Sequence, residues 1–248
     1  MDSHDNHVDD PILVTGAAGF VGANLLRRLT ATGAAVHAFV PARTDLWRIA
    51  DQAPRIVIHE VDLIDRPAVE QAVRAIRPRV IFHLAAHGAY AHQTDATGIV
   101  RSNLEGTVNL LNACAEIGFS AFVHSGSSSE YGIRHEPMRE EMRLEPNSLY
   151  AVTKAAATLY GRHVAVSREL PVVTLRFFSA YGPWEEPGRF VPTLLSSLLD
   201  GTLPPLVTPT TARDFIYIDD IVDACLATAA RAPRGGEILN VGTSGAHL

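Results

Sequence analysis

The chain has 248 residues, of which 47% are hydrophobic and 19% are charged, and its formal net charge is -6. This length and composition suffice for one sizeable hydrophobic core and exclude disorder over most of the sequence. The 21 Lys and Arg residues are spread along the chain, which argues against a surface that binds nucleic acid.

The cysteines and the N-terminal residues bear on the location of the protein. Cys114 and Cys225 lie in apolar helical patterns, which favours buried free thiols in a reducing compartment. Residues 1–10 are polar and acidic, and no segment reaches the roughly 18 consecutive apolar residues of a membrane span. No segment has the spacing of metal ligands either. We therefore expect a flexible leader at 1–10 and a cytoplasmic protein without a membrane segment or a metal.

Short apolar runs alternate with longer amphipathic segments from residue 12 onward. In chain order we predict a strand at 12–15, a helix at 19–32, strands at 35–40 and 55–60, a helix at 66–76, a strand at 80–84, a helix at 95–117, a strand at 121–125, a helix at 148–169 and a strand at 172–177. This alternation is typical of α/β proteins with a parallel sheet, and six strands make a full doubly wound sheet.

The pattern changes after Phe178, where six prolines divide the sequence into short pieces. We predict a helix at 190–199, a strand at 215–218, a helix at 219–230 and a strand at 237–241. The expected organisation is therefore a doubly wound domain at 11–178 and a small substrate-binding lobe at 179–248, interleaved with the last elements of the fold.

Three glycines, Gly16, Gly19 and Gly22, follow the first strand and open the first helix. At such a junction glycines form a tight turn, admit a pyrophosphate close to the backbone and let the helix pack on the strand. The spacing is G-x-x-G-x-x-G, and its place at the first strand–helix junction predicts a dinucleotide site.

The residues after the second and third strands bear on which dinucleotide binds. Val40 stands where NAD-binding proteins usually carry Asp or Glu, and Arg43 follows three residues later. Because a guanidinium can bind a 2′-phosphate in a bidentate fork, this pair favours NADP, with NAD still possible. Asp62 is a candidate partner for the adenine amino group.

A tyrosine and a lysine, Tyr150 and Lys154, lie four residues apart at the start of a predicted helix and so share one face. A phenol has a pKa near 10, and a neighbouring ammonium and a nicotinium ring would both favour the phenolate. Tyr150 could then act as a general acid and base. The serines at 125–129, which end a predicted strand, offer a hydroxyl to a substrate oxygen.

These motifs together resemble the extended short-chain dehydrogenase/reductase family, in particular its nucleotide-sugar epimerases, dehydratases and ketoreductases. The residues that carry the resemblance lie at 16–22, 62, 83–86, 103–107, 125–132, 150–154, 176–183 and 213–215. The resemblance implies a Rossmann fold, hydride transfer on a nucleotide-diphosphate sugar, and a homodimer formed through the helices at 95–117 and 148–169.

The resemblance also implies roles for individual residues. The catalytic hydroxyl is Ser127, which acts with Tyr150 and Lys154, while Asn103 supports the active site. The expected cofactor-binding residues are Gly16, Ala18, Gly19, Phe20, Val21, Gly22, Arg43, Asp62, Leu63, Leu84, Ala85, Ala86, Tyr150 and Lys154. The expected substrate-binding residues are His87, Ser128, Ser129, Ser179, Arg189 and Arg213. Of these, Arg213 and, as a weaker candidate, Arg189 would bind the diphosphate.

The sequence departs from the family pattern at several positions. The 4,6-dehydratases carry a carboxylate two residues before a Tyr-Gly pair, whereas this chain has Ser128 and Ser129 there, with Glu130 one place late. Ser179 replaces the Asn that many members carry before Tyr-Gly-Pro. Members normally continue well beyond residue 242 into a substrate lobe, so the sugar pocket is expected to be open or completed by a partner subunit.

Two enzymatic functions remain open at this point. One is an epimerase that oxidises and reduces a sugar carbon with a retained cofactor, and the other is a ketoreductase that consumes NADPH. The 4,6-dehydratase alternative is disfavoured by Ser128 and Ser129. A non-catalytic dinucleotide-binding regulator is a further alternative, against which Tyr150 and Lys154 argue.

Overall fold

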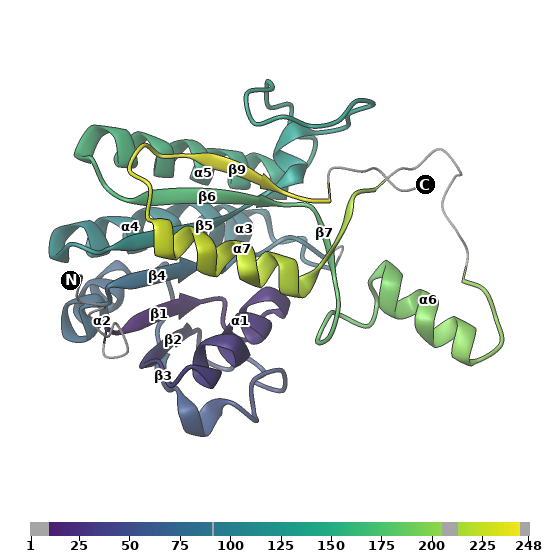
Figure 1. Cartoon of the computed structure of the whole chain (residues 1–248), viewed down its shortest axis with the longest axis horizontal. Coiled ribbons are helices and arrows are strands. Elements are labelled where there is room, and N and C mark those ends of the chain that lie inside the picture. The colour runs from purple at the N-terminus through teal and green to yellow at the C-terminus, as the bar shows by residue number, and fades with distance from the viewer. Residues whose placement is uncertain (1–9, 91, 205–212, 244–248) are drawn as a thin grey trace, which may run out of the picture.

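A seven-stranded parallel sheet forms the centre of the computed structural model, which describes residues 10–90, 92–204 and 213–243 (Figure 1). The strand order is β3-β2-β1-β4-β5-β6-β9. The strands are β1 (Ile12–Thr15), β2 (Val36–Val40), β3 (Val57–Glu60), β4 (Val80–His83), β5 (Ala121–Ser127), β6 (Val172–Phe177) and β9 (Ile238–Val241). The order reverses between β1 and β4, and ligands of doubly wound sheets bind in the crevice at such a switch point.

Helices cover both faces of the sheet. One face carries α1 (Phe20–Ala31) and α7 (Ile218–Arg231), and the other carries α2 (Arg66–Ile76), α4 (Gly106–Ile117) and α5 (Leu149–Arg168) (Figure 1). Successive residues of a strand point to opposite faces. In β1, Leu13 accordingly packs with α2 and α4, while Val14 packs with α1 and α7. Because both faces are buried at the centre of the sheet, β1 and β4 are largely apolar without alternation, and the predicted α/β doubly wound fold is confirmed.

The predicted helix at 95–117 contains an irregularity that periodicity did not indicate. It consists of α3 (Ala96–Val100), a π-helical segment at Arg101–Glu105, and α4. π-helical turns are rare and often occur at functional sites. This one contains Asn103, whose side chain is buried. The strand expected to end at Ser125 also continues to Ser127, which brings both serines onto β5.

The last elements of the chain return to the main sheet. Strand β9 pairs with β6, and α7 packs into the same core as α1. The remainder of the region after Phe178 contains a two-stranded parallel sheet of β7 (Ser179–Tyr181) and β8 (Phe215–Tyr217), together with helix α6 (Phe190–Leu199). No residue of α6 is buried, and the helix stands apart from the sheet (Figure 1).

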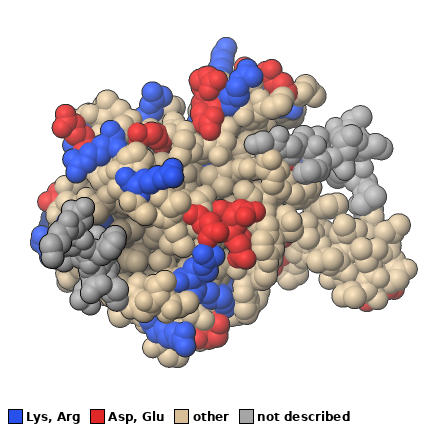
Figure 2. All heavy atoms as spheres, in the orientation of Figure 1, with Lys and Arg blue, Asp and Glu red and all other residues tan. Residues whose placement is uncertain are grey.

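Charged residues of both signs lie side by side on the face drawn in Figure 2. Two of the ion pairs on the surface are Arg27 with Asp51 and Arg28 with Asp223. Cys114 and Cys225 are free and buried, as predicted. Within the ranges that the structure describes, no helix is both long and apolar enough to cross a membrane.

Candidate active site

The turn between β1 and α1 lies against the end of β4 so closely that two of its positions require glycine. Gly16 has a φ of +71°, and a Cβ placed on it would lie 2.6 Å from the backbone nitrogen of Ala85. A Cβ on Gly22 would meet the carbonyl oxygen of Gly16 and lie 2.8 Å from the Cα of Ala17. The turn is therefore compact, and its backbone is open to a ligand at the switch point.

Helix α1 begins at the end of this turn, and no side chain caps its N-terminus. Its N-cap is Gly19, which has no side chain to bond the helix, and the first turn contains no acidic residue. The first N–H groups of a helix have no partner within the helix and carry partial positive charge. Together with the glycine cradle, they fit the pyrophosphate of a dinucleotide.

A cavity of about 440 Å³ adjoins the turn and runs over the carboxyl ends of β1 to β4. The expected cofactor-binding residues that line it are Gly16, Ala18, Gly19, Asp62, Leu63, Leu84, Ala85 and Ala86. His87, which was expected to bind substrate, also lines this cavity. Among the residues that the structure describes, the lining includes Thr44, Asp45 and Arg48 after β2 but not Arg43. Arg43 has a left-handed backbone, with a φ of 64°, and its contact with a 2′-phosphate stays a prediction.

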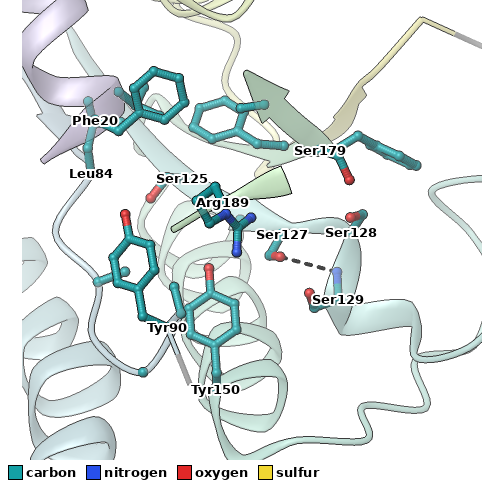
Figure 3. A pocket seen from close by; sticks show the side chains of 18 of the residues that line it. Phe20, Leu84, Tyr90, Ser125, Ser127, Ser128, Ser129, Tyr150, Ser179 and Arg189 are labelled. Carbon is teal, nitrogen blue, oxygen red and sulfur yellow. Dashed lines mark hydrogen bonds between the residues drawn. The ribbon is translucent and has the colours of Figure 1, made fainter. Parts of the chain in front are cut away.

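A second cavity, of about 390 Å³, shares Leu84, Ala86 and Tyr90 with the first, so the two form one continuous depression. Besides Leu84 and Ala86, ten of the residues that the sequence singled out lie in its wall (Figure 3): Phe20, Val21, Ser125, Ser127, Ser128, Ser129, Tyr150, Ser179, Arg189 and Arg213. They come from elements far apart in the sequence, namely α1, β5, α5, β7 and the segments around α6. We call this the sugar cavity and the first one the dinucleotide cavity.

The hydroxyl groups of Ser127 and Tyr150 meet in the sugar cavity. Ser127 ends β5 and accepts a hydrogen bond from the backbone N–H of Ser129 at 3.1 Å, which orients its side chain. Tyr150 lies in the first turn of α5, which Ser148 caps, and its hydroxyl lies beside Ser127 in the cavity (Figure 3). Burial raises the pKa of Tyr150, and the interaction with Ser127 offsets only part of that effect. The lowered pKa expected for Tyr150 is thus not produced by the protein side chains on their own.

Lys154 lies one turn further along α5, and its side chain is buried. Its ammonium donates a hydrogen bond of 3.4 Å to the hydroxyl of Ser125. Burial lowers the pKa of Lys154 to about 8, so the ammonium loses its proton more readily than a solvated lysine. Two buried histidines, His83 and His124, lie stacked nearby, and burial together with the charge of Lys154 lowers the pKa of each.

Asn103 braces the wall of the cavities without lining either one, among the residues that the structure describes. Its amide oxygen accepts a hydrogen bond from the N–H of His87 at 2.7 Å, and its amide nitrogen donates to the carbonyl of His87 at 2.8 Å. The same nitrogen donates to the hydroxyl of Thr153 on α5 at 2.9 Å. Asn103 therefore fixes the loop after β4 to the helix that carries Tyr150 and Lys154.

The carboxylate of Glu130 is turned into the protein interior. It lies 2.8 Å from the guanidinium of Arg176 in an ion pair in which both side chains are buried. It also accepts hydrogen bonds from the backbone N–H of Ser127 at 2.9 Å and from the hydroxyl of Thr158 at 3.0 Å. With these partners Glu130 organises the end of β5, and it does not line the sugar cavity.

Several residues of the two cavities had no signal in the sequence. Tyr90 lies beside Tyr150 (Figure 3), and burial raises its pKa. The side chain of Glu185 is 6% exposed, and its carboxylate lies 3.7 Å from Arg189. Burial raises the pKa of Glu185 as well. Both residues come from irregular segments without a periodic pattern or a motif, so only the three-dimensional arrangement reveals them.

Comparisons with known proteins identify the family of the chain and several relatives. The model of the family described as "NAD dependent epimerase/dehydratase family" matches residues 12–242. The chain is similar to dTDP-glucose 4,6-dehydratase of Streptomyces griseus, with 32% identity over 93% of this chain and 73% of that protein. It is also similar to UDP-glucuronate 4-epimerase 4 of Arabidopsis thaliana, with 32% identity over 90% of this chain but only 54% of that protein.

A solved structure described as MoeE5 in complex with UDP-glucose and NAD has the same fold. It superimposes with a TM-score of 0.81 and 32% identity, over 96% of this chain and 77% of that one. The chain thus spans between about half and three quarters of the length of these three proteins.

Proposed function

Because the chain belongs to the NAD dependent epimerase/dehydratase family, we propose that it is an epimerase that inverts one carbon of a nucleoside-diphosphate hexose. The observation that carries this proposal is that Ser127 and Tyr150 lie together in the sugar cavity, which is continuous with the dinucleotide cavity. A sugar held there would have one hydroxyl against the proton-transfer pair and the adjoining carbon toward the dinucleotide cavity.

Ser127, Tyr150 and Lys154 would each have a separate role in the reaction. The hydroxyl of Ser127 orients the reacting sugar oxygen, and Tyr150 takes the hydroxyl proton as the sugar is oxidised and returns it as the ketone is reduced. A nicotinamide held in the dinucleotide cavity would supply the acceptor, and later the donor, of the hydride. The charge of Lys154, together with that of a nicotinium ring, would favour the phenolate of Tyr150 and so oppose the effect of burial on the tyrosine.

Two features support epimerisation over the other reactions. A dehydration needs an acid for the departing water, but Ser129 stands where the dehydratases of the family carry a carboxylate, and Glu130 is held by Arg176. A ketoreductase would consume free NADPH, which Val40 and Arg43 favoured, and Arg43 is not among the described residues that line the dinucleotide cavity.

We propose NAD as the dinucleotide, in place of the NADP expected from Val40 and Arg43. Asp45 lies in the cavity wall after β2, and its carboxylate would repel a 2′-phosphate while accepting a hydrogen bond from a ribose hydroxyl. Arg48, a cation in the same wall, is already paired with Glu186 at 2.6 Å. The similarity to MoeE5, whose structure was determined with NAD, supports the same choice.

The bound dinucleotide tests this part of the proposal. We expect mass spectrometry of the purified protein to identify NAD that is retained through washing. We expect Asp45→Asn to narrow the preference for NAD over NADP by about ten-fold, since it removes a charge that repels the phosphate. Tighter binding of NADP than of NAD by the unaltered protein would contradict the proposal.

The family resemblance also supports a cytoplasmic homodimer, which we include in the proposal. The dimer would use the exposed side of α5, where Val152, Leu159 and Val166 recur every seven residues and are 46%, 54% and 60% exposed. Residues at this spacing share one face of a helix. For the substrate we propose a UDP- or dTDP-linked hexose bound through Arg213 and Arg189 at the sugar cavity.

A further inference from the structure

Two loops that are distant in the sequence meet beside the cavities. The cofactor loop, residues 41–48 after β2, contributes Thr44, Asp45, Trp47 and Arg48 to the wall of the dinucleotide cavity. The sugar loop, residues 182–189 after β7, contributes Glu185 and Arg189 to the wall of the sugar cavity. A rigid contact between these loops would connect the two binding events.

Arg48 makes this contact at two points. Its Nε donates a hydrogen bond to the carbonyl oxygen of Trp184 at 2.8 Å, and a terminal nitrogen lies 2.6 Å from the carboxylate of Glu186. The side chain of Arg48 is 11% exposed and that of Glu186 is 38% exposed, so solvent screens the pair in part. Because a guanidinium is planar and rigid, two bonds from it fix both the distance and the direction of the sugar loop.

The tryptophan of the sugar loop has a backbone conformation that depends on such contacts. Trp184 has a φ of +71°, in the left-handed region that a bulky residue adopts only when its surroundings impose it. Its ring lies 6.0 Å from that of Trp47, and the guanidinium of Arg27 lies 4.0 Å above it. The sugar loop is therefore held in place largely by the cofactor loop and α1.

We propose that Arg48 is a positioning residue that couples the two cavities. A dinucleotide that packs against Trp47 and Arg48 would fix the cofactor loop. Arg48 would then fix the sugar loop through Glu186 and Trp184. Glu185 and Arg189 are thereby held in the wall of the sugar cavity before the sugar nucleotide binds. The protein with bound dinucleotide therefore binds the sugar nucleotide more tightly than the dinucleotide-free protein. The ligand identities rest on the proposed function, whereas the coupling between the loops does not.

The first experiment detects the coupling between the loops when NAD binds in the absence of a sugar nucleotide. The chain contains two tryptophans, and both lie in this contact, so Trp47→Phe leaves Trp184 as the single reporter. Trp184 lines neither cavity among the residues that the structure describes. We expect NAD added to the dinucleotide-free protein to change the emission of Trp184. The further change Glu186→Gln should weaken that response while NAD still binds, because only the bond from Arg48 to Trp184 remains. An equal response in both variants would overturn the proposal.

The second experiment measures the affinity for UDP-glucose in a Tyr150→Phe background, where turnover does not interfere. We expect saturation with NAD to tighten binding of UDP-glucose about five-fold or more, the range of ordinary allosteric coupling. In Arg48→Ala, which removes both bonds, the ratio of the two affinities should fall to less than about two, and in Glu186→Gln, which leaves the bond from Arg48 to Trp184, it should be intermediate. Glu70→Gln, which removes an Arg–Glu pair of 2.6 Å on α2, is the matched control and should keep the full ratio.

The ratio distinguishes coupling from a general structural role. If Glu186→Gln lowers the affinity for UDP-glucose equally with and without NAD, Glu186 only supports the fold of the loop. That result would overturn the proposal. If the protein binds both ligands with the expected ratio but turns over no sugar nucleotide, the proposed function fails while the coupling stands.

Discussion

At the scale of single residues, the account depends on the phenol of Tyr150. We expect Tyr150→Phe to lower kcat by about two to four orders of magnitude, since it removes the proton-transfer group and leaves the ring. The affinity for the dinucleotide should change by less than about three-fold. Steady-state kinetics together with dinucleotide titration checks both values. Tyr160→Phe, on the same helix but away from the cavities, is the control and should retain activity.

The buried ammonium of Lys154 makes a prediction about stability. Its pKa in the folded protein is about 8, below the value near 10.5 of an unfolded chain. The unfolded chain therefore binds more protons between these values, and stability should rise with pH across this window. At pH 7 Lys154 is protonated in both states, so the free-energy cost of burying its charge is fully present. Lys154→Met should accordingly stabilise the dinucleotide-free protein by about 1–3 kcal/mol at pH 7, and by much less near pH 10.5.

Urea unfolding at the two pH values measures this difference. The variant should also lose activity, because the charge that favours the phenolate of Tyr150 is gone. A variant that is less stable than the unaltered protein at pH 7 would contradict the inference that burial outweighs the hydrogen bond to Ser125.

The sequence predicted part of the site at this scale, and physical reasons explain the remainder. The glycines at Gly16 and Gly22 and the Tyr150–Lys154 spacing are local features, so the sequence contains them directly. Arg43 was predicted to bind a 2′-phosphate, and that contact stays a prediction, because the direction of its side chain depends on the path of a loop rather than on a period. Glu185 was not predicted, because it reaches the sugar cavity through contacts between distant segments.

At the scale of elements, the ends of β5 and β6 are joined by the buried pair of Glu130 and Arg176. Removing one partner leaves a buried charge without compensation. We expect Arg176→Met to destabilise the protein by about 3–5 kcal/mol, and Glu130→Gln added to it to recover part of that loss. Chemical denaturation of the single and double variants provides the values. A loss below about 1 kcal/mol for the single variant would contradict the importance of the pair for this end of the sheet.

The elements themselves were largely predictable. The strands and helices of the sheet follow from apolar periodicity, and α2 and β6 have the predicted bounds. The π-helical segment at Arg101–Glu105 was not predictable, because its register depends on the tertiary contacts of Asn103 with His87 and Thr153. The pairing of β9 with β6 is likewise a long-range contact, which no local pattern specifies.

At the scale of the whole molecule, the proposed homodimer makes a prediction about α5. Leu159→Asp places a charge in the middle of the exposed apolar stripe and should convert a dimer into a single chain of 26.8 kDa. Light scattering coupled to size-exclusion chromatography measures the mass. Leu199→Asp, at a position on α6 that is 88% exposed, is the control and should leave the dimer intact. A monomeric unaltered protein would contradict the proposed dimer.

The central claim concerns the reaction, and product analysis tests it most directly. The purified protein with its retained dinucleotide is incubated with UDP-glucose, UDP-glucuronate and dTDP-glucose, and the sugars are identified by NMR. The account predicts that at least one sugar nucleotide converts to an epimer without net consumption of NAD or NADPH, and that Tyr150→Phe forms none. A 4-keto-6-deoxy product, or conversion that requires stoichiometric NADPH, would contradict it.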